Sequence, residues 1–291
     1  MSARSCLLAI AALAGAAHPA AAVPIAALAI GMTTQLIGFD SASPGAITST
    51  LTVTGLPAND HLDAIAVSPN NGELYAVTIS SNIYTVDTTT GAATFVAPTS
   101  IPVQPSGITF DPGTNTIRAI SHSGENLRIN PVTGAAAADG ALAYAPGDAN
   151  AGASPYLSGI GYTGQGQLFS LDLARSLFVQ IDPSSGAVTT VAPTGVSFAS
   201  SEGFDIVGPN TAFATSAMYP GLVEFDSINL QTGAATIIGL ISNQGNSILS
   251  IAAAQVGAPV QAVPEPASLA LLTLGLAGLL AMHRRPAARK T

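Results

Sequence analysis

Two short segments of the sequence combine an imidazole with a carboxylate. His61-Leu-Asp63 and His122-Ser-Gly-Glu125 each offer one nitrogen and one acidic group, a combination that suits either a metal ligand or acid/base catalysis. Glu202 adds a further acid. The same residue types are also common as hydrogen-bonded polar groups in loops, and the pairs do not recur at regular intervals along the chain. We therefore keep the five residues as weak catalytic candidates and predict no metal site and no cofactor.

A repeated turn pattern indicates which elements position these residues. A polar residue closes an alternating apolar run, and a glycine follows four residues later. Asp or Asn accepts hydrogen bonds from nearby amides in such turns, and Gly adopts the positive φ that other residues resist. The copies are Asp87-Thr-Thr-Thr-Gly91, Asn130-Pro-Val-Thr-Gly134, Asp182-Pro-Ser-Ser-Gly186, Asn229-Leu-Gln-Thr-Gly233 and the longer Asp40-Ser-Ala-Ser-Pro-Gly45. We interpret the acids as structural, because no second acid accompanies them at calcium-ligand spacing.

Successive glycines of this repeat lie 46, 43, 52 and 47 positions apart, a period typical of a propeller blade of four short strands. Complete blades are predicted at 62–96, 107–138, about 159–191 with a longer segment around 172–180, and 203–238. An inner strand at 247–256 and three strands at 25–30, 35–39 and 46–53 complete a fifth blade. The sequence therefore predicts an all-β, five-bladed propeller at 23–257, closed by its N- and C-terminal strands. The five candidate residues would lie on loops at one mouth of its channel.

Most aromatic residues alternate along the predicted strands, where they suit a core. These are Tyr75, Tyr84, Phe95, Phe110, Phe169 and Phe178. The chain contains no Trp, so the aromatic platforms on which sugars stack are few. The residues near loops that are left to contact a ligand are Tyr144, Tyr156, Tyr162 and Tyr219.

The N-terminal end has the layout of a secretory signal peptide. Arg4 precedes an apolar run, and small residues follow up to Ala22. We predict a signal helix at residues 1–22 that is recognised by the secretion machinery and removed. Cys6 lies inside this segment, so the mature protein would have no disulfide.

The C-terminal end has the layout of a membrane anchor. A Pro-rich linker at 258–266 ends in Val263-Pro264-Glu265-Pro266, and the apolar run from Ala267 to Met282 follows it. A helix of this run would span roughly 24 Å of a hydrocarbon layer of about 30 Å. We predict a transmembrane helix at 267–283 and a basic cytoplasmic tail at 284–291, which begins with Arg284 and Arg285 and leaves the body outside. A buried C-terminal helix is the alternative, but the run has no polar face.

This order of Pro-Glu-Pro, apolar span and arginines resembles the PEP-CTERM sorting signal of exported bacterial proteins. The sorting residues would be Val263, Pro264, Glu265, Pro266, Arg284 and Arg285. The resemblance implies processing by a membrane-embedded exosortase, in bacteria that often make exopolysaccharide.

Several segments of the body are also similar to a family of exported bacterial proteins with a propeller-like domain of unknown function. They are Leu36-Ile-Gly-Phe-Asp-Ser-Ala-Ser-Pro-Gly45, Gly72-Glu-Leu-Tyr75, Ile83-Tyr-Thr-Val-Asp87, Asn126-Leu-Arg-Ile-Asn-Pro131 and Gly203-Phe-Asp-Ile206. The resemblance implies the propeller fold and no particular catalytic residue.

Charge restricts the partners of the body. Residues 23–263 contain three arginines, no lysine and fifteen acidic residues, a formal charge of −12. Such a surface repels phosphate backbones, so we predict no nucleic-acid partner. The favoured function is a non-enzymatic binding or structural module of the cell surface or exopolysaccharide matrix, membrane-anchored before processing and then at the surface or extracellular. The alternative is a periplasmic or secreted, lactonase-like propeller hydrolase that uses the five candidate residues.

Overall fold

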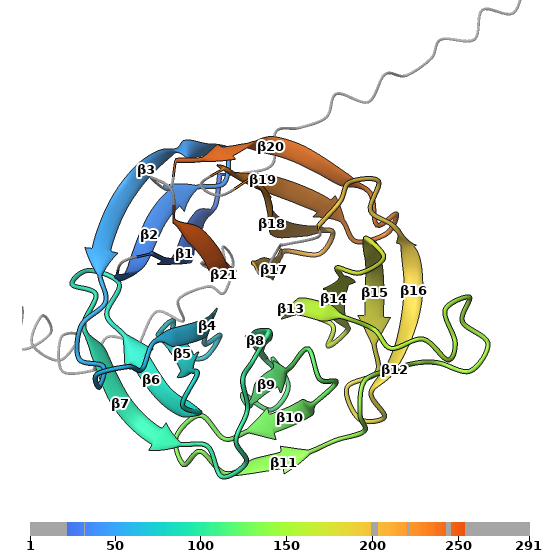
Figure 1. The fold of residues 1–291 in the computed structure, drawn as a ribbon, viewed down its shortest axis with the longest axis horizontal. Helices are drawn as coiled ribbons and strands as arrows, with labels where there is room; N and C mark the ends of the chain where they lie inside the picture. The colour runs from blue at the N-terminus through green and yellow to red at the C-terminus, as the bar shows by residue number, and fades with distance from the viewer. Residues whose placement is uncertain (1–21, 32, 199–202, 220–221, 243–245, 254–291) are drawn as a thin grey trace, which may run out of the picture. The chain divides into compact units, whose positions relative to one another are not determined.

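The computed structural model describes residues 22–31, 33–198, 203–219, 222–242 and 246–253. Within these ranges, 21 β-strands form five sheets arranged as the blades of a ring (Figure 1). The predicted all-β, five-bladed propeller is therefore confirmed. The predicted signal helix at 1–22 lies outside the described residues, apart from its last residue, Ala22. The predicted sorting motif and transmembrane helix also lie outside them. In the part that is described, no helix is long and apolar enough to cross a membrane.

Four blades are continuous in sequence, and in each a four-stranded meander starts at the innermost strand; in blade 3 one additional edge strand precedes this meander. Blade 1 consists of β4 (Leu62–Val67), β5 (Leu74–Thr78), β6 (Asn82–Val86) and β7 (Ala93–Pro98). Blade 2 consists of β8 (Gly107–Phe110), β9 (Ile117–Ile120), β10 (Asn126–Ile129) and β11 (Ala136–Ala138). Blade 3 consists of β13 (Leu157–Tyr162), β14 (Leu168–Asp172), β15 (Leu177–Ile181), β16 (Ala187–Pro193) and the edge strand β12 (Ala143–Tyr144). Blade 4 consists of β17 (Phe204–Val207), β18 (Thr211–Tyr219), β19 (Leu222–Asn229) and β20 (Ala235–Ile241).

The fifth blade, called the closing blade below, combines strands from both ends of the domain. Its strand order is β21 (Ser247–Ala253), β1 (Pro24–Ile30), β2 (Thr34–Asp40) and β3 (Ser43–Thr52). β21 is innermost and pairs antiparallel with β1, from Ile25 opposite Ala253 to Ile30 opposite Ser247. This pairing confirms the predicted closure by the terminal strands.

The closing strand β21 is also bonded to the blades on either side of it. The backbone N–H of Ala253 donates to the Asp205 carboxylate of blade 4, at 2.8 Å. On the other side, the N–H of Ile65 in blade 1 donates to the Ser250 hydroxyl, at 3.2 Å. Asp205 belongs to one of the family-like segments, so closure gives that segment a structural role.

The repeated turns join the third and fourth strands of blades 1 to 4, as their residues predict. Each polar residue accepts two backbone amides; for Asp87 these are the N–H groups of Thr89 and Thr90, at 2.7 and 3.0 Å. The four glycines have φ values between 70 and 77°. The fifth copy differs, because Asp40 accepts the amide of Ala42 and Gly45 lies within β3. In this copy a two-residue turn at 41–42 joins β2 to β3, with Asp40 paired to Ser43.

These turns also lock each blade to the preceding one. At Gly134 a Cβ atom would collide with the backbone carbonyl of Pro98, at the outer end of blade 1. The Gly134 carbonyl in turn accepts the N–H of Ser100 at 2.8 Å. Gly91 faces the Thr52 carbonyl of the preceding blade in the same way, and Gly186 faces the carbonyls of Gly140 and Ala141 in the segment that follows blade 2. Glycine is needed here for its positive φ and also for lack of space.

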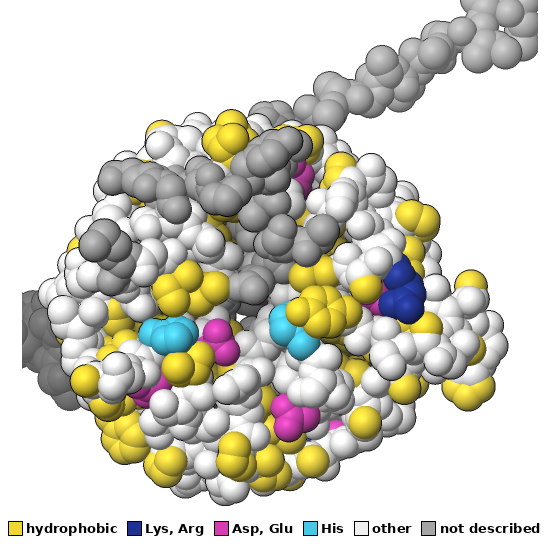
Figure 2. All heavy atoms as spheres, in the orientation of Figure 1, with side chains coloured by type: hydrophobic (Ala, Val, Ile, Leu, Met, Phe, Trp, Pro, Cys, Tyr) yellow, Lys and Arg dark blue, Asp and Glu magenta, His cyan; other side chains and the backbone are white. Residues whose placement is uncertain are grey.

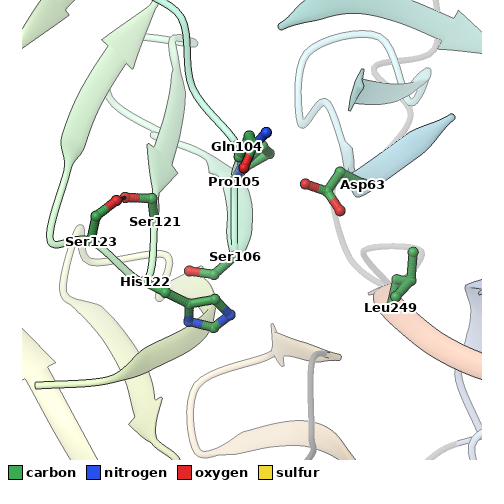
Figure 3. A pocket seen from close by; sticks show the side chains of 8 residues that line it. All are labelled: Asp63, Gln104, Pro105, Ser106, Ser121, His122, Ser123 and Leu249. Carbon is green, nitrogen blue, oxygen red and sulfur yellow. Dashed lines mark hydrogen bonds between the residues drawn. The ribbon is translucent and has the colours of Figure 1, made fainter. Parts of the chain in front are cut away.

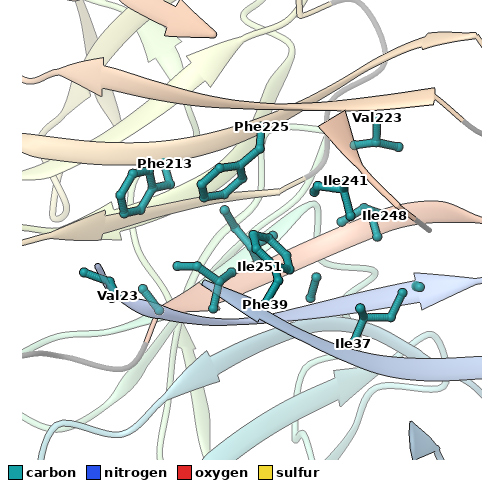
Figure 4. Close-up of a cluster of buried hydrophobic side chains, with 13 residues drawn as sticks. Val23, Ile37, Phe39, Phe213, Val223, Phe225, Ile241, Ile248 and Ile251 are labelled. Atoms are coloured by element: carbon teal, nitrogen blue, oxygen red, sulfur yellow. The ribbon is translucent and has the colours of Figure 1, made fainter. Parts of the chain in front are cut away.

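Five clusters of buried apolar side chains lie between neighbouring blades, one for each interface. Between the closing blade and blade 4, Phe39 meets Phe225 edge-on with ring centroids 5.1 Å apart, and Ile251 of β21 packs in the same cluster (Figure 4). Such aromatic pairs contribute about 0.5–1.5 kcal/mol beyond their area burial. The ends of the domain are thus held by packing as well as by strand pairing.

Two sequence predictions about blades 1 and 3 are wrong. Phe95 is predicted in the core, but it is 54% exposed on the outer strand β7, where it makes a T-shaped contact with Tyr84. The expected extension of blade 3 around 172–180 is a short turn and β15. The additional residues instead lie in 139–156, which carries the edge strand β12 beside β16. The other five residues predicted for the core are buried: Tyr75, Tyr84, Phe110, Phe169 and Phe178.

The role of space at the turn glycines is testable with a matched pair of variants. Gly72 has nearly the same positive φ as Gly134, 72° against 70°, but nothing lies within 4 Å of the position that its Cβ would take. Gly72→Ala should lower the free energy of unfolding by about 1 kcal/mol through backbone strain alone. Gly134→Ala should cost about 1–3 kcal/mol more, because the Pro98 carbonyl must move. Equal losses in urea unfolding would contradict the locking of blade 2 onto blade 1.

Candidate functional site

Four of the five candidate residues from the sequence lie at one end of the ring. His61 and Asp63 stand at the start of β4, and His122 and Glu125 in the loop between β9 and β10. The strands of each blade run alternately up and down, starting with the innermost one. The start of the first strand and the loop between the second and third strands therefore lie on the same face of the propeller. Figure 2 shows this face, with histidine and acidic side chains around its centre. Glu202 lies outside the described residues.

A cavity of about 240 Å³ opens on this face and brings two of the candidates together. Asp63 and His122 both point into it, although they belong to different blades (Figure 3). The remaining lining residues are Gln104, Pro105, Ser106, Ser121, Ser123 and Leu249. Neither His61 nor Glu125 lines it, and Glu125 is exposed. The cavity therefore brings Asp63 of blade 1 together with His122 of blade 2.

Local irregularities of the inner strands aim two of these side chains. The β4–β5 register passes from Leu62 to Ala64, so Asp63 is the extra residue of a β-bulge. The β21–β1 register skips Leu249 in the same way. A bulge turns a side chain away from the regular alternation of its strand. This explains how Asp63 and Leu249 both reach the cavity from strands whose neighbours are buried.

The cavity changes the acidity of both titratable groups. Burial raises the pKa of the Asp63 carboxyl, an effect that the charge of His61 partly offsets. Burial lowers the pKa of the His122 imidazole, so this ring is neutral at pH 7. Its Nδ1 atom is buried and has no hydrogen-bond partner. A neutral imidazole and a carboxyl group are thus available to a molecule in the cavity.

An aromatic ring extends this site at its rim. Tyr156, just before β13, stacks on the His122 ring with centroids 4.2 Å apart and planes 5° apart. The Tyr156 side chain is nevertheless 45% exposed. Tyr144 and Tyr162, also considered as contact residues, are buried, and the Tyr144 hydroxyl donates to Asp172 at 2.6 Å. The side chain of Tyr219 lies outside the described part of the structure.

Sequence reasoning missed the small polar residues of the cavity. Gln104, Ser106, Ser121 and Ser123 have the composition of ordinary loops and carry no spacing signal. The sequence predicts an inner strand at 247–256, which contains Leu249, but no residue pattern predicts the bulge at this position. Among the described residues, no group of three or more His, Cys, Asp or Glu side chains is placed to hold a metal ion.

Asn126 and Arg128, from the family-like segment Asn126 to Pro131, belong to a second polar cluster, away from the cavity. The guanidinium of Arg118, which is 2% exposed, donates to Asp139 at 2.6 Å, to Asn126 at 2.8 Å and to the Pro183 carbonyl at 3.0 Å. Arg128 binds the same carboxylate of Asp139 in bidentate fashion, at 2.7 and 2.9 Å. Pro183 belongs to blade 3, so this cluster joins blades 2 and 3.

Removal of Asp139 should destabilise the protein much more than removal of Arg128. Asp139→Ala leaves Arg118 buried without a counter-ion and should lower the free energy of unfolding by about 3 kcal/mol or more. Arg128→Ala removes a side chain that is 49% exposed and leaves the Arg118–Asp139 pair intact. Its cost should be about 1 kcal/mol or less. Similar losses for both variants in denaturant titrations would contradict this structural role.

The strand order and the ring closure define the class of this protein as a five-bladed β-propeller. The sequence profile described as "Domain of unknown function (DUF4394)" matches residues 35–252. The chain therefore belongs to the DUF4394 family. A second profile, the PEP-CTERM protein-sorting motif, matches residues 262–285 and identifies an exported protein that is processed by an exosortase-type enzyme.

Solved structures similar to this chain are related in fold alone. A protein of unknown function from Bacteroides thetaiotaomicron shares 15% identity over 67% of this chain and 54% of its own, with a TM-score of 0.51. This chain thus spans about half the length of that structure. A chain of a nidogen/laminin complex shares 12% identity over 80% of this chain and 98% of its own, with a TM-score of 0.49. No curated protein matches the sequence significantly.

Proposed function

We propose that this protein is a non-enzymatic binding module of the cell surface that holds a segment of exopolysaccharide at the mouth cavity. The observation that supports it best is the exposed Tyr156 ring, stacked on His122 beside a polar cavity. The apolar face of a sugar ring packs on an aromatic ring. Its hydroxyl groups need hydrogen-bonding partners at the edge of that contact.

The lining supplies such partners in a small space. The Asp63 carboxylate accepts hydrogen bonds from sugar hydroxyls, the Gln104 amide donates and accepts, and the Ser106 hydroxyl does both. A cavity of about 240 Å³ suits one sugar unit of a chain rather than a whole oligosaccharide. The neighbouring units would lie across the rim, where Tyr156 is exposed.

The charged groups of the cavity lining indicate which kind of sugar would bind. The cavity lining contains an acid and no arginine or lysine. Elsewhere in the described residues, Arg118, Arg128 and Arg175 are engaged by Asp139 and Asp172. The site therefore favours a neutral or amino-substituted sugar over a uronic acid, whose carboxylate would meet Asp63 without a compensating cation.

The export route is consistent with this role. The sorting motif directs the chain to exosortase-type processing. We propose that the signal peptide at 1–22 delivers the chain to the secretion machinery and that the helix at 267–283 anchors it until processing. The propeller is then displayed at the surface or released into the matrix, where polysaccharide is abundant.

The exposed aromatic residues provide the test. Tyr156→Ala should weaken binding of the full-length protein to neutral polysaccharide from its own cells by about tenfold or more, as expected for loss of a central aromatic contact. Phe95→Ala removes a ring of similar exposure on β7, remote from the cavity, and should leave the dissociation constant unchanged. Isothermal titration calorimetry measures both, and equal affinities of the two variants would contradict the proposed site.

A hydrolase remains the second candidate, favoured by one observation. The neutral imidazole of His122 and the Asp63 carboxyl line one cavity, as a base and an acid would. The same titrations distinguish the two candidates. If sugar or lactone products are released by the wild-type protein and not by His122→Asn, the protein is an enzyme and the binding-module proposal fails.

A further inference from the structure

Three polar side chains gather on one face of the β18–β19 hairpin in blade 4. Ser216 and Glu224 are directly opposite each other in the strand register. Asp226 lies two residues beyond Glu224 and therefore on the same face of β19. Between them in sequence, Phe225 points the other way, into the apolar cluster with the closing blade. The polar group thus lies on the side of blade 4 that faces blade 3.

The oxygens of this group outnumber its hydrogen-bond donors. Ser216 Oγ lies 3.3 Å from Glu224 Oε2 and 3.3 Å from Asp226 Oδ2. A serine hydroxyl carries one proton and donates to one of the two carboxylates at a time. Asp226 is 0% exposed, and its Oδ1 atom has no hydrogen-bond partner. A buried carboxylate oxygen without a donor is costly, which indicates a missing partner.

None of the described basic side chains supplies that partner. Residues 23–263 contain three arginines and no lysine. Arg118 and Arg128 are bound to Asp139, and Arg175 is bound to Asp172. Burial and the charge of Glu224 raise the pKa of Asp226 to about 6. Among the described residues, no basic side chain therefore stands opposite Glu224 and Asp226.

We propose that Ser216, Glu224 and Asp226 bind a divalent cation of the calcium class. Ca²⁺ takes six to eight oxygen ligands at about 2.3–2.6 Å, and adjacent ligands at right angles are then about 3.4 Å apart. The two 3.3 Å separations around Ser216 Oγ match this spacing. Two carboxylates and a hydroxyl supply part of the shell, and water completes it. Sites of extracellular modules bind Ca²⁺ at about 10⁻⁴–10⁻³ M, which suits an exported protein.

Calcium binding and thermal stability test this site in the full-length protein at pH 7.5. Equilibrium dialysis should find one more Ca²⁺ per chain in the wild type than in Asp226→Asn, and Glu224→Gln should weaken this site at least tenfold. At a Ca²⁺ concentration about tenfold above Kd, the wild-type Tm should rise by about 3–5 °C relative to NaCl of equal ionic strength. Both variants should lose this rise.

Asp182→Asn is the matched control. It removes one negative charge from a turn where Asn130 and Asn229 stand at the equivalent positions of other blades, so the fold accepts it. It should keep the Ca²⁺ response of the wild type. If Asp226→Asn does not fold, Glu224→Gln decides, because Glu224 is partly exposed.

Two results would overturn the proposal. One is a Ca²⁺ stoichiometry and Tm response that are the same in the wild type, Asp226→Asn and Glu224→Gln. The other is a wild-type Tm that does not respond to Ca²⁺ but rises on acidification from pH 7.5 to 5.5, an increase that Asp226→Asn abolishes. The second result would show that the two carboxylates share a proton instead of a cation.

Discussion

The pairing of β21 with β1 is the contact on which the rest of the structure depends. These strands come from opposite ends of the domain. Their pairing closes a loop as long as the domain itself, which has a cost in conformational entropy. Backbone pairing, the Phe39–Phe225 cluster and the Ala253–Asp205 hydrogen bond offset that cost together. Without this contact, β1 and the inner strands beside it would present free edges and apolar faces.

Closure also completes the candidate site. Leu249, the bulged residue of the closing strand, forms one wall of the cavity into which Asp63 and His122 point. The carboxylate comes from blade 1 and the imidazole from blade 2, so no single blade contains the site. The proposed cation site differs in this respect, because Ser216, Glu224 and Asp226 all belong to one hairpin of blade 4. It would stabilise that blade from within, whereas the mouth cavity depends on the ring.

The ring could be predicted from sequence because its signals are local and repeated. Asp87 and Gly91, like their counterparts in later blades, fix a turn through neighbouring backbone amides, and the turn spacing gives the blade length. Only part of the candidate site could be predicted from the sequence. His122 and Asp63 were identified as candidates, but their meeting depends on blade packing and on a bulge that no residue pattern marks. In the sequence, Glu224 and Asp226 are polar residues that alternate with apolar ones, as in any half-exposed strand. The burial of Asp226 follows from blade packing, so the sequence pattern does not reveal it.

A disulfide across the closure tests the central claim most directly. Ala26 and Ala252 are opposite each other in the β1–β21 register, and the predicted mature chain has no cysteine of its own. The double variant Ala26→Cys with Ala252→Cys should form an intramolecular disulfide under mild oxidation and keep its native circular dichroism spectrum. Ala26→Cys with Ala119→Cys, which places the second thiol in blade 2, should not. Thiols that remain free at positions 26 and 252 of the folded protein would contradict a ring closed by its ends.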